Sequence, residues 1–225
     1  AVDLPGFGRA SRLAPGAILP QLDAFAAALV QEWGGAEPVV VAGSSLGGCV
    51  ALRLAEHASE LPLAGVIPVA PAGLQTPGWF DLVERDPIVR RLLDIPMPVP
   101  GALVRALVTS GAYRQLAFSH PSAGQREVVD AFAAHHDSRR RVAALLESGR
   151  HLLPELAAAP FDLAAVGCPV LLVWGSRDRM VPHTGARVVL EALPGTHVEL
   201  IEGCGHCPQI EATDRLLELL LGFPT

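Results

Sequence analysis

The chain has 225 residues, of which 50% are hydrophobic, and this is enough apolar material for one substantial core. Its 17 basic and 23 acidic residues give a formal net charge of −6 without any basic stripe, so the composition argues against a nucleic-acid partner. No apolar run approaches the roughly 18 residues of a membrane span, and the four cysteines do not indicate a disulfide framework.

The first residues, Ala1–Asp3, have the pattern of a strand end, and the turn-rich residues 4–9 follow them. Because the first residue is alanine and the pattern is that of a strand cut through, we expect the chain to start inside its domain, with the first strands of a sheet missing. A targeting signal upstream of Ala1 would lie outside this sequence, and the expected location is the cytoplasm. The abundance of Ala, Gly, Pro and Arg without lysine is typical of a high-GC bacterial coding bias.

A helix is predicted over residues 19–33, because its apolar residues recur at helical spacing on one face. The members of this stripe are Leu22, Phe25, Ala26, Leu29, Val30 and Trp33. The apolar, β-branched run of residues 39–42 then predicts a strand that is buried on both faces.

Gly43-Ser44-Ser45-Leu46-Gly47 follows that strand directly, and residues 48–55 have a helical pattern. A G-x-S-x-G between a strand and a helix is typical of a nucleophile elbow, in which a sharp turn holds the serine at the sheet edge. We expect glycine at positions 43 and 47 because a Cβ would crowd this turn. The alternative is a glycine-rich turn that has no chemical role.

Another buried strand is predicted over residues 63–70. Two more strands are predicted over 169–174 and 197–201, with a helix over 181–193 between them. Strands that alternate with helices indicate an α/β fold, with a mostly parallel sheet and helices on both faces.

Residues 74–160 interrupt this alternation, because they contain several helical patterns and no convincing buried strand. We therefore expect a core formed by residues 1–73 and 161–225, with residues 74–160 inserted as a helical cap. The aromatic residues of this insertion could line an apolar substrate pocket or form the core of the cap itself. They are Trp79, Phe80, Phe118 and Phe132.

A serine needs a base to take its proton, and that base should follow another strand of the same sheet. Asp178 lies in the loop after the strand 169–174, and His206 lies in the loop after the strand 197–201. In this interpretation His206 accepts the proton of Ser45 and Asp178 orients the imidazole. Alone, Asp178 could be a turn residue and His206 a capping residue. Together they occur in the order Ser, Asp, His that this sheet architecture requires.

The chain resembles the α/β-hydrolase superfamily, and in particular its capped serine hydrolases. The resemblance covers nearly the whole chain and is carried by Asp3-Leu4-Pro5-Gly6-Phe7-Gly8, Gly43-Ser44-Ser45-Leu46-Gly47-Gly48, Trp174-Gly175-Ser176-Arg177-Asp178, Val181-Pro182 and Gly203-Cys204-Gly205-His206. It implies that Ser45, Asp178 and His206 are the nucleophile, acid and base. It also implies that the backbone N–H of Leu46 is one donor of the oxyanion hole.

Two departures from the family pattern stand out. Many relatives have histidine where this chain has Ser44, a change that leaves the triad intact. The family's second oxyanion donor comes from a His-Gly-type loop upstream of the Asp-Leu-Pro-Gly segment, and this chain has no such loop. Since the loss of one oxyanion donor costs about 10²–10³ in kcat, we expect the chain as given to be weakly active or inactive.

Cys204-Gly205-His206-Cys207 resembles a small metal-binding motif. Zinc, however, would require a fourth ligand, and His206 as a ligand could not act as the base. We therefore expect no metal and no cofactor. The function expected from the sequence is hydrolysis of a small, largely apolar ester or related carbonyl substrate through an acyl-enzyme. Two alternatives stay open: carbon–carbon bond hydrolysis of a meta-cleavage product by the same triad, and a catalytically weak ligand-binding protein on this fold.

Overall fold

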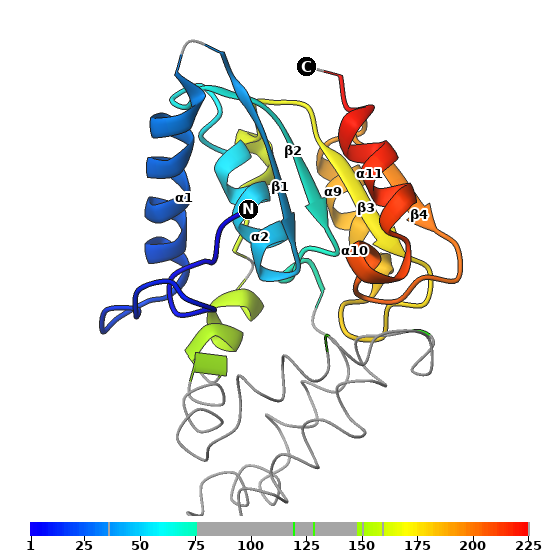
Figure 1. The fold of residues 1–225 in the computed structure, drawn as a ribbon, viewed down its shortest axis with the longest axis horizontal. Coiled ribbons are helices and arrows are strands. Elements are labelled where there is room, and N and C mark those ends of the chain that lie inside the picture. Colours follow the sequence, from blue (N-terminus) through cyan, green and yellow to red (C-terminus); the bar gives the residue numbers. More distant parts are fainter. Residues whose placement is uncertain are drawn as a thin grey trace, which may run out of the picture.

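A computed structural model describes residues 1–35, 37–75, 148–149, 151–158 and 160–224, together with Ser119 and Val128 (Figure 1). Its strands are β1 (Val39–Ser44), β2 (Leu63–Val69), β3 (Leu171–Gly175) and β4 (His197–Ile201). Its named α-helices are α1 (Leu19–Gly34), α2 (Leu46–Ala55), α9 (Ala186–Ala192), α10 (Pro208–Glu211) and α11 (Thr213–Leu221). Short 3₁₀ turns occupy Leu163–Ala165 and His183–Gly185.

The four strands form one sheet in the order β1-β2-β3-β4, and every pairing is parallel. All the carboxyl ends therefore meet at one edge of the sheet, which is the edge on which ligands bind in open α/β folds. The predicted α/β class with a parallel sheet is confirmed.

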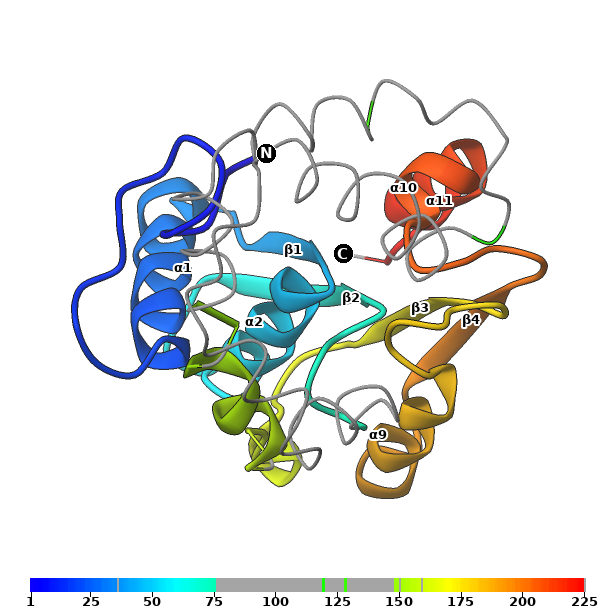
Figure 2. The ribbon, with the colours of Figure 1, turned by 90° about the horizontal axis from the view of Figure 1, so that it is seen from below.

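Both faces of the sheet are covered, as predicted. Alternate residues of the central strands point to opposite faces, so that Val66 and Leu172 pack in a cluster with α1, α2 and α9, whereas Ile67 and Val173 pack in a second cluster with α11. Figure 2 shows α2 and α9 on one side of the sheet and α11 on the other. Each of these four side chains is at most 1% exposed, which explains why the central strands are apolar throughout.

The helix predicted over 19–33 is confirmed as α1, but its stripe ends earlier than expected. Leu22, Ala26 and Val30 are buried, whereas Trp33 is 62% exposed. The chain instead brings Gly34 against Pro62, where a Cβ would overlap the proline ring. The last turn of α1 therefore makes its contact through a glycine, and the tryptophan points to solvent.

Three other expectations are wrong in detail. Residues 1–4 form no strand, and Val2 is 47% exposed. β1 is only partly buried, because it has a partner on one side alone within the described sheet. The helix predicted over 181–193 begins only at Ala186, since Pro182 is extended and residues 183–185 form a 3₁₀ turn.

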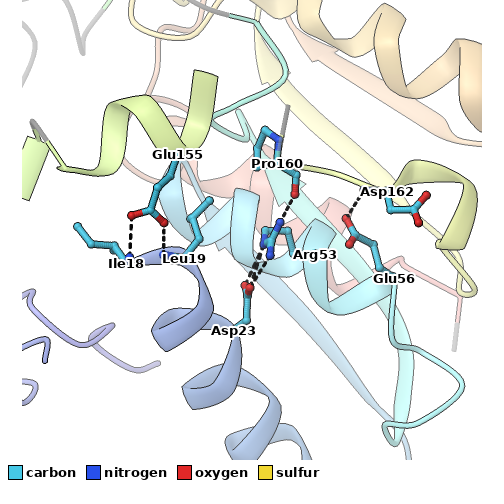
Figure 3. Close-up of polar contacts among 8 residues, drawn as sticks. All are labelled: Ile18, Leu19, Asp23, Arg53, Glu56, Glu155, Pro160 and Asp162. Atoms are coloured by element: carbon cyan, nitrogen blue, oxygen red, sulfur yellow. Dashed lines mark hydrogen bonds and ion pairs between the residues drawn. The ribbon is translucent and has the colours of Figure 1, made fainter. Parts of the chain in front are cut away.

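Four hydrogen bonds join Glu155, Pro160 and Asp162 to α1, α2 and the residues that cap them (Figure 3). The Glu155 carboxylate accepts hydrogen bonds from the Ile18 and Leu19 amides, at 2.7 and 2.8 Å. Arg53 pairs with Asp23 and also donates to the carbonyl of Pro160. The Asp162 amide donates to Glu56 at 3.0 Å. Within the described residues, no helix is both long enough and apolar enough to cross a membrane.

Changing Glu155 to alanine is expected to lower the free energy of unfolding by about 1–2 kcal/mol, because it leaves two amides at the start of α1 without acceptors. Urea unfolding followed by circular dichroism measures this loss. Glu32→Ala, near the other end of α1, is the control and should change stability by less than about 0.5 kcal/mol, because Glu32 is exposed. Equal effects of the two substitutions would contradict a capping role for Glu155.

Candidate functional site

Ser45 occupies a strained turn between β1 and α2. Its φ and ψ are 55° and −112°, and among the described residues only Ser45 and Ala70 have positive φ without being glycine. Such a conformation costs about 1–3 kcal/mol and persists only where neighbouring contacts impose it. Here the Ser45 amide donates to the Val69 carbonyl at 2.8 Å, while the Ser45 carbonyl accepts from Cys49 at 2.9 Å and Ala72 at 3.1 Å.

The two glycines of the turn are not equivalent. A Cβ at Gly43 would overlap the carbonyl group of Gly47, so the backbone of the turn approaches itself as predicted. A Cβ at Gly47 would meet no atom within 4 Å in the described part of the chain. The expectation that both positions require glycine is therefore right for Gly43 and wrong for Gly47.

The start of α2 supplies free backbone N–H groups beside Ser45. The first amide bonded in this helix is that of Cys49, and in the described residues the amides of Leu46 and Gly47 donate to no backbone acceptor. Amides at a helix N-terminus favour negative charge. The Leu46 N–H, which the sequence predicts as an oxyanion donor, lies at this helix N-terminus directly after the serine.

Asp178 and His206 form a buried pair. The His206 Nδ1 and Asp178 Oδ2 atoms are 2.8 Å apart, and the two side chains are 6% and 0% exposed. The other carboxylate oxygen, Oδ1, accepts from the amides of Met180 at 2.8 Å and Val181 at 2.9 Å. The carboxylate is thus fixed from two sides and presents one oxygen to the imidazole.

Backbone contacts hold the loops of Asp178 and His206 together. The Ser176 and Arg177 amides donate to Ile201 and Cys204, at 3.0 and 2.8 Å. At the end of β3, a Cβ on Gly175 would overlap the carbonyl oxygens of Cys204 and Gly205, so glycine is required for this approach. The role of Gly175 was not predicted, although a glycine at the end of a strand that precedes a candidate residue was a visible signal.

The three residues predicted as a triad all lie at the carboxyl edge of the sheet, after β1, β3 and β4. The structure joins Asp178 directly to His206. Within the described residues the Ser45 hydroxyl makes no hydrogen bond, so the structure does not join it to His206. The four aromatic residues proposed for the pocket, Trp79, Phe80, Phe118 and Phe132, lie outside the described residues.

The cysteines around the site are buried thiols. Burial raises the pKa of Cys49, Cys204 and Cys207 to about 12 in each case. They are therefore protonated at neutral pH and are poor nucleophiles and metal ligands in that form. In the part of the chain that the structure describes, no group of three or more His, Cys, Asp or Glu side chains could hold a metal ion.

A family model described as "Alpha/beta hydrolase family" matches residues 1–219. A pimeloyl-[acyl-carrier protein] methyl ester esterase of Xanthomonas campestris is 30% identical over 223 residues, which cover 99% of this chain and 82% of that protein.

Solved structures share the fold. An alpha/beta hydrolase fold protein from Burkholderia ambifaria superposes with a TM-score of 0.73 at 21% identity, over 98% of this chain and 78% of that one. The 2-hydroxy-6-oxo-6-phenylhexa-2,4-dienoate hydrolase from Rhodococcus superposes with a TM-score of 0.70 at 21% identity, over 98% of this chain and 77% of that one.

Proposed function

Because the chain belongs to the alpha/beta hydrolase family and is a hydrolase of the esterase kind, we propose that Ser45 is its nucleophile, His206 its general base and Asp178 the carboxylate that orients the base. The hydrogen bond of 2.8 Å between Asp178 and His206 carries this proposal. A buried carboxylate on Nδ1 fixes the imidazole tautomer, so that Nε2 is left free to accept a proton.

The reaction then proceeds in two halves. The Ser45 oxygen attacks the ester carbonyl while His206 Nε2 takes its proton, and the resulting imidazolium is stabilised by Asp178. The oxygen of the tetrahedral intermediate accepts a hydrogen bond from the Leu46 N–H. When the intermediate collapses, His206 gives its proton to the departing alcohol and an acyl-enzyme remains. Water activated by His206 then releases the acid and restores Ser45.

The strained backbone of Ser45 supports the same assignment. A positive φ at a serine is costly, and such strain is concentrated at functional positions. A serine that only connected β1 to α2 would gain nothing from this conformation, and a glycine there would remove its cost.

For the substrate, we propose an ester that joins an acyl chain to a small alcohol. The relative named as a methyl ester esterase supports this class, because it aligns with 99% of the chain. The neighbour that is named as a dienoate hydrolase has 21% identity and supports the fold alone. Methyl esters of medium-length acids should therefore be cleaved with a higher kcat/KM than vinylogous diketones. The reverse ranking would favour carbon–carbon bond hydrolysis.

A fluorophosphonate probe tests the nucleophile. Even if turnover is as weak as the sequence predicts, a serine activated by His206 should react with the probe. We therefore expect the wild-type chain to be labelled on the peptide that contains Ser45, and Ser45→Ala to abolish both labelling and any ester hydrolysis. Ser44→Ala is the matched control, because it removes the neighbouring hydroxyl at the end of β1, and it should retain labelling. Absence of labelling in the wild-type chain, measured by intact-protein mass spectrometry, would contradict the proposal and favour a ligand-binding role.

A further inference from the structure

Glu211, at the end of α10, binds two parts of the chain with its two carboxylate oxygens. Oε1 accepts a hydrogen bond of 3.1 Å from the amide of Gly205, the residue before His206. Oε2 accepts from the amide of Ser119 at 2.9 Å and also from the Ser119 hydroxyl, 92 residues away in the sequence. Glu211 is therefore a bridge between the histidine loop and the insertion predicted from the sequence.

Cys207, on the other side of His206, makes a second contact with the insertion, this time by apolar packing. The side chain of Cys207 is 7% exposed and packs against Val128, Met180 and Ile210. Val128 belongs to the insertion, and Met180 belongs to the loop of Asp178. His206 thus lies between one residue that is tied to Ser119 through Glu211 and one that packs directly on Val128.

The bond to Asp178 alone does not determine where the imidazole lies relative to Ser45. It fixes the distance between Nδ1 and one carboxylate oxygen, but the loops of Asp178 and His206 could shift together with respect to the turn after β1. A misplacement of about 1 Å between reacting groups can cost about 10²-fold in rate. A second attachment of the histidine loop is therefore of direct value to catalysis.

We propose that Glu211 is a positioning residue for His206, because its carboxylate holds the Gly205 amide on one side and Ser119 on the other. This inference rests on the proposed function. Both oxygens act as acceptors, and three donors converge on them. A glutamine at this position would place an NH₂ group opposite one of these donors. An aspartate would keep the charge, but it is one methylene shorter and could not reach both Gly205 and Ser119.

The test compares Glu211→Gln and Glu211→Asp with the wild-type chain. We expect both variants to lower kcat for ester hydrolysis, and the rate constant of fluorophosphonate labelling, by about 10- to 100-fold. KM should stay within about twofold, because Glu211 is not proposed to contact the substrate. Glu202→Gln is the matched control: it makes the same chemical change on an exposed side chain in the same loop and should leave both rates unchanged.

The outcomes separate the inference from the function on which it rests. A wild-type chain that is not labelled would overturn both proposals. If the wild type is labelled, but a folded Glu211→Gln variant has the same kcat and the same labelling rate constant, only the positioning role is overturned. Urea unfolding gives the folded fraction of each variant, and a fall in rate that only follows this fraction would also overturn it. Full activity in Glu211→Asp would show that the charge suffices and would overturn the requirement for two attachments.

Discussion

Changing Asp178 to asparagine is expected to lower kcat by about 10⁴-fold while the fold is retained. Oδ1 of Asp178 accepts from the amides of Met180 and Val181, so the amide oxygen of asparagine must take this place. The NH₂ group then faces Nδ1 of His206. Nδ1 becomes an acceptor, the ring proton moves to Nε2, and Nε2 can no longer take the proton of Ser45. Steady-state kinetics on a methyl ester measures the loss.

Asp162→Asn is the matched control for this substitution. Asp162 is exposed, and it is the Asp162 amide rather than its side chain that binds Glu56. The kcat of Asp162→Asn should remain within about twofold of the wild-type value. A nitrogen NMR spectrum of His206 should report the changed tautomer in Asp178→Asn. If that variant kept more than about a tenth of the wild-type kcat, the role proposed for Asp178 would be wrong.

Changing Gly43 to alanine is expected to cost more than about 3 kcal/mol of stability, because its Cβ would overlap the carbonyl group of Gly47. Both partners of this overlap are backbone, so no side chain can rotate away, and the turn that holds Ser45 would have to open. Urea unfolding measures the loss of stability. The rate of fluorophosphonate labelling at low temperature measures any displacement of Ser45.

Gly47→Ala is the matched control, since it introduces the same methyl group into the same pentapeptide. Its Cβ would meet no described atom within 4 Å, and alanine favours a helix over glycine by about 1 kcal/mol. We therefore expect stability equal to or slightly above that of the wild-type chain. A Gly47→Ala variant as unstable as Gly43→Ala would contradict the asymmetry of the turn.

Local sequence patterns were sufficient to predict the parallel sheet and the places of Ser45, Asp178 and His206. Each of these residues lies in the turn or loop that follows a strand, and strands of parallel sheets have strong apolar runs. The sequence was less informative at the ends of elements. The spacing of Trp33 continues the apolar stripe of α1. In the structure, however, Gly34 rather than Trp33 packs against Pro62, and Trp33 is exposed. This packing depends on the position of Pro62, in a loop further along the chain.

Long-range polar contacts could not be predicted from the sequence. Glu155 caps a helix that begins 136 residues earlier, and Glu211 binds Ser119 across 92 residues. Each is an ordinary glutamate in a helical pattern, and only the folded arrangement gives it partners. The approach of Gly175 to Gly205 is of the same kind, because it follows from the packing of β3 against β4.

The contacts of residues 155–162 have a consequence for protein engineering. Glu155 and Pro160, at the C-terminal end of the predicted insertion, and Asp162, just after it, hydrogen-bond to residues of α1 and α2 or their caps. A chimera could therefore replace residues 76–150 by the equivalent piece of another esterase and still retain this set of attachments. Such a chimera would have to keep Ser119 and Val128, because Glu211 and Cys207 of the histidine loop region contact them.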